Sequence, residues 1–158
     1  AAYERNGQRI SSTFIREQLA NDDFGLVEQL LGRPFSMKGE VEHGQQLGTD
    51  LGFPTCNLNP GRRKIPLNGV FACEVRLGDR YRQAAVNIGY RPTITEEGSA
   101  LLEAHILDFD EDLYGKTIEI IFRQKLREEL KFDGLEALKQ QMSVDVQQVR
   151  EVFNERLS

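Results

Sequence analysis

The architecture follows from two segments near the middle of the chain, VFACEVRL (residues 70–77) and YRQAAVNI (residues 81–88). Both contain several β-branched and aromatic side chains, which are typical of strands. Gly78 and Asp79 lie in the link between them, and this pair readily forms a tight turn because glycine adopts positive φ angles. The pattern therefore predicts an antiparallel β-hairpin.

Further strand-like segments lie on both sides of this hairpin. Residues 35–41 alternate with period two, and residues 100–109 and 116–126 are rich in aliphatic side chains. We count about six short strands, separated by Gly and Pro turns with no helix between them. This arrangement predicts a mainly β protein, an antiparallel barrel or sandwich rather than βαβ units.

Helical patterns flank the strands. Residues 11–31 carry apolar side chains at helical spacing, and we expect two short helices there because Gly25 weakens the middle of the segment. Near the C-terminus, an apolar stripe predicts a helical face packed on the strands. Its members are Leu135, Leu138, Met142, Val146, Val149 and Phe153. Ser143 and Asp145 are suitable caps, so we expect a break near residue 143.

Length and composition restrict the class of protein. A chain of 158 residues fits one domain and can fold without a structural metal. It has 20 Lys and Arg against 25 Asp and Glu, and its net charge of −5 disfavours general binding to nucleic acids or membrane surfaces. No apolar run has the ~18 residues of a membrane span, and we expect a cytoplasmic protein. Cys56 and Cys73 lack metal-ligand spacing and are expected to be free thiols.

The first candidate site is a glycine-containing segment followed by a short polar strand. Gly44, Gly48 and Gly52 recur every four residues and would let the backbone approach an anion closely. Thr55 and Asn57 follow, and in an extended segment their side chains project from the same side. A hydroxyl and an amide oxygen are hard ligands suited to Mg²⁺. The alternative is an ordinary flexible hairpin of turn-forming residues.

The second candidate site is Glu103, in the strand-like segment 101–109. Glu103 and His105 would share one face of this strand, opposite a face of apolar side chains. A carboxylate in a mostly apolar strand can act as a general base, whereas the alternative is a Glu on the solvent face of an edge strand. For His105 we expect a hydrogen-bonded core histidine rather than a ligand.

The third candidate site comprises residues 112–115 and 126–132. Their aromatic side chains could stack on a planar ring, and Arg127 could pair with a phosphate or stack. From the residues alone we favour the alternative, a turn with a buried Tyr followed by solvated charges.

Together these segments resemble the riboflavin kinase family. The resemblance rests on five blocks that occur in the family's order and cover about residues 33–153. The blocks are Gly44 to Leu58 with its Gly52-Phe-Pro-Thr-Cys-Asn57 core, Gly69-Val-Phe71, Val86-Asn-Ile-Gly89 with Arg91-Pro-Thr93, Leu102 to Phe109, and Asp112-Leu-Tyr-Gly115 with Leu126, Arg127 and Phe132.

The resemblance implies a six-stranded antiparallel Greek-key barrel with C-terminal helices and a short N-terminal helical stub. It also implies transfer of the ATP γ-phosphoryl group to the ribityl 5′-hydroxyl of riboflavin, giving FMN and ADP, with Mg²⁺ as cofactor. The implied roles, carried over by position, are Mg²⁺ ligands for Thr55 and Asn57, catalytic base for Glu103, nucleotide contacts for Gly44, Gly48, Thr55, Ile106, Asp108 and Tyr114, and flavin contacts for Arg127 and Phe132. Cys56 stands where the family usually has Ala, and Thr49 where it usually has Arg or Lys.

The N-terminal segment carries a second resemblance. Residues 10–16, ISSTFIR, are similar to the segment that closes the nucleotidyltransferase domain of bacterial bifunctional riboflavin kinase/FAD synthetases. From this similarity we expect residues 1–31 to be a stub of that domain, which is absent here, and residues 32–158 to be the kinase domain. A stub would also account for Ala1 in place of an initiator Met. Thr49 and the stub at residues 1–31 motivate an alternative function, a non-catalytic flavin-binding or docking module of the same enzyme.

Overall fold

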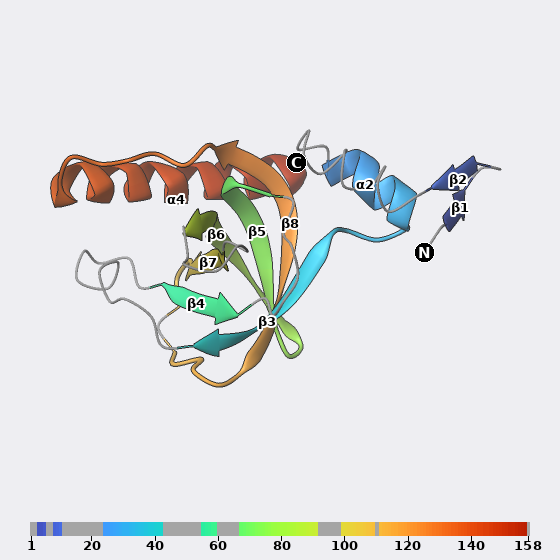
Figure 1. Cartoon of the computed structure of the whole chain (residues 1–158), viewed down its shortest axis with the longest axis horizontal. Helices are drawn as coiled ribbons and strands as arrows, with labels where there is room; N and C mark the ends of the chain where they lie inside the picture. The colour runs from blue at the N-terminus through green and yellow to red at the C-terminus, as the bar shows by residue number, and fades with distance from the viewer. Residues whose placement is uncertain are drawn as a thin grey trace.

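The computed structural model describes residues 3–5, 8–10, 24–42, 55–59, 67–91, 99–109 and 111–157 (Figure 1). The elements within these residues are β1 (Tyr3–Arg5), β2 (Gln8–Ile10), α2 (Phe24–Leu31), β3 (Ser36–Glu42), β4 (Cys56–Asn59), β5 (Gly69–Leu77), β6 (Arg80–Arg91), β7 (Ser99–Ile106), β8 (Thr117–Arg127) and α4 (Leu135–Leu157).

Six of the strands close into an antiparallel barrel, as the sequence predicts. The order around the barrel is β3-β4-β7-β6-β5-β8. β5 and β6 form the predicted hairpin, paired from Gly69 opposite Ile88 to Leu77 opposite Arg80. Gly78 adopts a φ of 67° at the turn, a conformation that glycine reaches without steric cost. Closure of the sheet gives every strand of the barrel a partner on each side.

The barrel interior is filled by side chains that alternate along each strand. The aromatic centre consists of Phe71 and Phe122, whose rings meet edge to face with centroids 5.6 Å apart. Phe24 of α2 stacks on Phe122 at 6.1 Å, so this helix covers part of the core. α2 confirms the second half of the helical zone predicted at 11–31, and residues 11–23 lie outside the described residues. Cys73 is buried and Cys56 half-buried, and both are free thiols as predicted.

A small hairpin near the N-terminus was not predicted. β1 and β2 pair antiparallel, with Tyr3 opposite Ile10 and Arg5 opposite Gln8. Each strand has three residues, which is too short for an alternating pattern to be recognised. The expected helical stub therefore also contains strands.

α4 is one continuous helix of 23 residues, so the predicted break near residue 143 is wrong. Asp145 does not cap a new helix, because its carboxylate accepts two hydrogen bonds from the Arg127 guanidinium while its backbone continues the helix. The C-terminal half of α4 packs Val149 and Phe153 against the outer face of the barrel. The N-terminal half extends past the strands (Figure 1), and Leu135 at its start is 56% exposed. The predicted apolar stripe is therefore packed on the barrel along only part of its length.

Candidate active site

One row of facing residues crosses five strands of the barrel. Asn57 of β4 lies opposite Glu103 of β7, and Glu103 lies opposite Asn87 of β6. Asn87 lies opposite Val70 of β5, which in turn faces Arg127 of β8. The side chains next to Asn57, Glu103 and Asn87 along their strands point into the core, so alternation places this row on the outer face.

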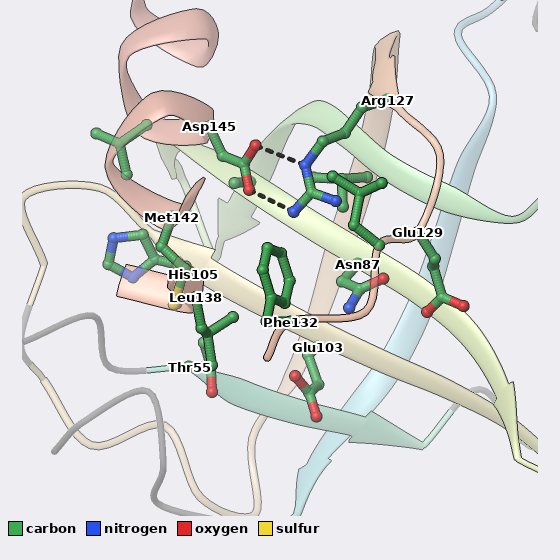
Figure 2. A pocket seen from close by; sticks show the side chains of 14 residues that line it. Thr55, Asn87, Glu103, His105, Arg127, Glu129, Phe132, Leu138, Met142 and Asp145 are labelled. Atoms are coloured by element: carbon green, nitrogen blue, oxygen red, sulfur yellow. Dashed lines mark hydrogen bonds and ion pairs between the residues drawn. The ribbon is translucent and has the colours of Figure 1, made fainter. Parts of the chain in front are cut away.

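This outer face is the floor of a cleft of about 170 Å³ (Figure 2). Residues 129–132 and the first half of α4 form the rest of its lining. The cleft is lined by Thr55, Val70, Ala85, Asn87, Glu103, His105, Arg127, Glu129, Leu130, Phe132, Leu138, Met142, Asp145 and Val146. Polar groups thus lie mainly on the strands and apolar side chains mainly on the helix and the preceding segment.

A hydrogen-bonded ion pair connects the floor of the cleft to the helix. Arg127 donates from Nε to Asp145 Oδ1 and from Nη2 to Oδ2, both at 2.8 Å. Its Nη1 donates to the carbonyl oxygen of Glu128 at 3.0 Å, and its guanidinium lies 6.0 Å from the Phe132 ring centroid. Gln141 Nε2 donates to the same Asp145 at 3.0 Å. Arg127 therefore holds α4 and Phe132 in place, and each of its three guanidinium nitrogens already has an acceptor.

A second carboxylate, that of Glu129, lies over the floor beside Asn87. The side chain of Glu129 lies over Gly89, where a Cβ atom would collide with its carboxylate. Gly89 is two residues beyond Asn87 on β6, on the same face. The absence of a side chain at Gly89 therefore gives Glu129 its place in the cleft, next to the Asn87 amide (Figure 2).

Several predicted site residues meet in this cleft. Thr55, Glu103, Arg127 and Phe132 line it, and Asn57 lies directly opposite Glu103. Facing residues on antiparallel strands have Cβ atoms roughly 4.5–5.5 Å apart. The structure thus brings together the hydroxyl, amide and carboxylate that the sequence singled out on two separate segments.

The predicted nucleotide contacts lie elsewhere. Gly44 and Gly48 are outside the described residues, whereas Ile106 is buried in the barrel core. Asp108 is exposed and accepts two hydrogen bonds from Arg150 at 3.1 Å, which lowers the pKa of its carboxyl. Tyr114 is 54% exposed. The cleft lining does not include Ile106, Asp108 or Tyr114.

Two expectations from the sequence require correction. His105 is not a core residue: it lines the cleft, because alternation with the buried Ala104 and Ile106 directs it to the outer face. Tyr114 is not buried: its side chain is exposed, in a turn where its backbone N–H donates to Asp112 Oδ1 at 2.9 Å and the neighbouring Leu113 is buried instead.

Three polar residues of the cleft lining were not singled out from the sequence as site residues: Asn87, Glu129 and Asp145. Asn87 is one of several polar residues in segment 81–88, so no local signal in the sequence distinguished it from an ordinary strand residue. Glu129 and Asp145 appear in the sequence as members of charged helical or loop segments. Their place in the cleft depends on contacts between distant segments.

The donor set is suited to a hard cation bound together with a phosphate. Thr55 and Asn57 offer neutral oxygens and Glu103 offers an anionic one, which are the ligand types that Mg²⁺ takes alongside water and substrate oxygens. Within the described ranges, no group of three or more His, Cys, Asp or Glu side chains is arranged to hold a metal ion. The described helices include none with the length and apolar character needed to span a membrane.

Curated relatives of this chain are bifunctional enzymes. The bifunctional riboflavin kinase/FMN adenylyltransferase of Pseudomonas fluorescens is 48% identical over 147 residues, covering 93% of this chain and 47% of the relative. The Haemophilus influenzae protein of the same name is 46% identical over 151 residues, covering 94% of this chain and 48% of the relative. The chain thus spans about half the length of the curated relatives it matches.

Solved structures share the fold. A Streptococcus pneumoniae chain named as a macrolide-efflux protein matches with a TM-score of 0.82 and 31% identity, covering 94% of this chain and 49% of that one. Riboflavin kinase from Trypanosoma brucei matches with a TM-score of 0.56 and 27% identity, covering 77% of this chain and 80% of that one. A riboflavin kinase (flavokinase) family model matches residues 31–153. By this match and the identities to its relatives, the chain belongs to the riboflavin kinase family.

Proposed function

We propose that this chain transfers the γ-phosphoryl group of ATP to the 5′-hydroxyl of riboflavin. The observation that carries the proposal is the pairing of Asn57 with Glu103 on the floor of a cleft whose opposite wall is mainly apolar. A phosphoryl transfer needs an oriented hydroxyl and neutralised phosphate charge more than it needs a covalent protein intermediate. Both requirements can be met within this one cleft.

Glu103 is the proposed base. It projects from the barrel strand β7, which pairs with β4 on one side and β6 on the other. A rigid strand holds the carboxylate at a fixed place, so a substrate hydroxyl can be presented to it in one orientation. As the oxygen–phosphorus bond forms, Glu103 would accept the hydroxyl proton, a contribution of about 10²–10⁴ in rate.

Thr55 and Asn57 are the proposed residues for holding Mg²⁺. Their oxygens are neutral, so the charge of the cation remains available to the phosphate oxygens. When bound, the cation supplies neutralisation of the charge on the phosphates. Thr55 stands two residues before Asn57 on the same face, at the edge of the cleft shown in Figure 2.

The apolar wall is the proposed site of the flavin ring. Phe132, Leu138 and Met142 face the cleft, and an aromatic ring with two flexible aliphatic side chains can pack on a planar tricycle. Because its guanidinium already bonds Asp145 and Glu128, Arg127 acts on the flavin by positioning Phe132 and α4.

The nucleotide side of the site is proposed from the family resemblance. Gly44 and Gly48 would form the loop over the phosphates, with Thr55 at its end. Ile106, Asp108 and Tyr114 would lie on the nucleotide side. Of these, the exposed ring of Tyr114 is suited to stacking on a purine.

The wider context is also a proposal. The curated relatives are about twice as long and are named for a second activity, FMN adenylyltransferase. We propose that residues 32–158 are the kinase domain and that residues 1–31 belong to the end of such an adenylyltransferase domain. That domain would take the FMN produced here as its substrate.

The test is FMN formation by the purified chain from riboflavin, ATP and Mg²⁺, followed by chromatography with fluorescence detection. The proposal predicts FMN that depends on both ATP and Mg²⁺. Binding of riboflavin without any FMN would contradict it and would instead support a non-catalytic flavin-binding module.

A further inference from the structure

One polar atom on the cleft floor makes no hydrogen bond within the part of the chain that the structure describes. The side-chain oxygen of Asn87, Oδ1, is buried and has no hydrogen-bond partner among the described residues. A buried acceptor without a donor destabilises a folded protein by the full cost of removing it from water. Native proteins keep few such atoms, and each one suggests a missing partner.

The surroundings of Asn87 explain why its described neighbours do not supply a donor. Its neighbours in the cross-strand row are Glu103 and Val70, and Glu129 lies over the next outward position of β6. An ionised carboxylate only accepts hydrogen bonds, and valine has no polar group. Arg127, the next residue of the row, already donates from Nε, Nη1 and Nη2 to other acceptors.

The place of Asn87 indicates what the missing donor is. Asn87 and Glu103 face each other on adjacent strands, so their Cβ atoms are roughly 4.5–5.5 Å apart. A group that bonds Asn87 is therefore a near neighbour of the group that approaches Glu103. In the proposed reaction Glu103 takes the terminal hydroxyl of the ribityl chain, and the near neighbours of that hydroxyl are the other hydroxyls of the same chain.

We infer that Asn87 Oδ1 accepts a hydrogen bond from an internal hydroxyl of the polyol chain of the phosphate acceptor. This inference rests on the proposed kinase function. The bond fixes the chain along the strand row and directs its terminal hydroxyl to Glu103. Asn87 thus selects an acceptor that carries a polyol, in addition to the selection of a planar ring by the apolar wall.

The experiment compares two ligands and does not depend on turnover. Riboflavin and lumiflavin share the ring system, but lumiflavin carries a methyl group in place of the polyol. Binding of each is measured by fluorescence quenching with the wild-type chain, Asn87→Ala and Asn87→Leu. Leucine has the same number of side-chain heavy atoms and the same branching at Cγ as asparagine but no acceptor, whereas alanine also leaves a gap. Comparing the two variants therefore separates loss of the acceptor from a change in packing. The control is Gln83→Ala, which removes an amide from the same face of β6 outside the cleft.

Loss of one neutral hydrogen bond is expected to weaken riboflavin binding by about 5- to 10-fold in both Asn87 variants. Lumiflavin binding is expected to stay at the wild-type value, as is riboflavin binding by Gln83→Ala. Equal weakening for both ligands, or no weakening for either, would overturn the inference while leaving the kinase proposal intact. A wild-type chain that fails to bind riboflavin would overturn both.

Discussion

The ion pair between Arg127 and Asp145 predicts a large effect of the substitution Asp145→Ala. The side chains are 18% and 7% exposed, respectively, and two hydrogen bonds of 2.8 Å join them. Removing one partner of a buried pair typically costs about 3–5 kcal/mol, because the other charge is left buried. The partial exposure of Arg127 reduces this, and we expect the free energy of unfolding to fall by about 2–4 kcal/mol.

For a chain of this length, that loss corresponds to a decrease in Tm of about 5–12 °C. Urea unfolding followed by circular dichroism measures the free energy directly. Alanine favours helices, so the loss does not come from helix propensity. The matched control is Glu151→Ala on an exposed face of α4, where Glu151 Oε1 accepts a long hydrogen bond of 3.5 Å from Gln147 Nε2. Its effect is expected to stay within about 0.5 kcal/mol.

The same substitution is expected to raise the KM for riboflavin, because Arg127 no longer holds Phe132 and α4 against the cleft. The KM for ATP is expected to change much less. A stability of Asp145→Ala within about 1 kcal/mol of the wild type would refute the conclusion that this pair fastens the helix to the barrel.

Two further predictions concern the core and the thiols. Phe24→Ala removes a ring that stacks on Phe122 and meets Phe71 edge to face, and is expected to cost about 3–5 kcal/mol in urea unfolding; a cost below 1 kcal/mol would show that α2 does not close the core. Burial raises the pKa of the Cys56 and Cys73 thiols, so the thiolate fraction is lower than in an unfolded chain. Iodoacetamide should therefore label the native protein more slowly than the urea-unfolded protein at pH 8, and Cys73 more slowly than Cys56. Equal labelling rates in both states would contradict this.

The strands could be predicted from sequence where local signals agree. In the 70–88 hairpin, the turn residues Gly78 and Asp79 and the β-branched side chains support the same structure, and the observed register follows from the two-residue turn. In strand 99–106, alternation alone placed Glu103 and His105 on one face, which is the face that lines the cleft. These features depend on residues that are close together in the sequence, so they can be predicted from one sequence.

Features that depend on distant partners could not be predicted in the same way. Asp145 is a residue type that often caps helices, but its carboxylate accepts hydrogen bonds from Arg127, 18 residues away. The helix therefore continues through Asp145. Asn87 was indistinguishable from any polar residue on a strand until the register placed it beside Glu103. The Glu129 carboxylate lies in the cleft because Gly89 has no side chain to fill that space. Each depends on a tertiary contact rather than on a local propensity.

The most direct test of the proposed chemistry is the kcat for FMN formation by Glu103→Gln, compared with the wild type and with Glu40→Gln. Glutamine keeps the size of the side chain but cannot accept the proton, so kcat is expected to fall by about 10²–10⁴-fold while riboflavin still binds. Glu40 is exposed on barrel strand β3, and its variant is expected to keep wild-type turnover. A Glu103→Gln chain with near-normal kcat would show that this carboxylate is not the base.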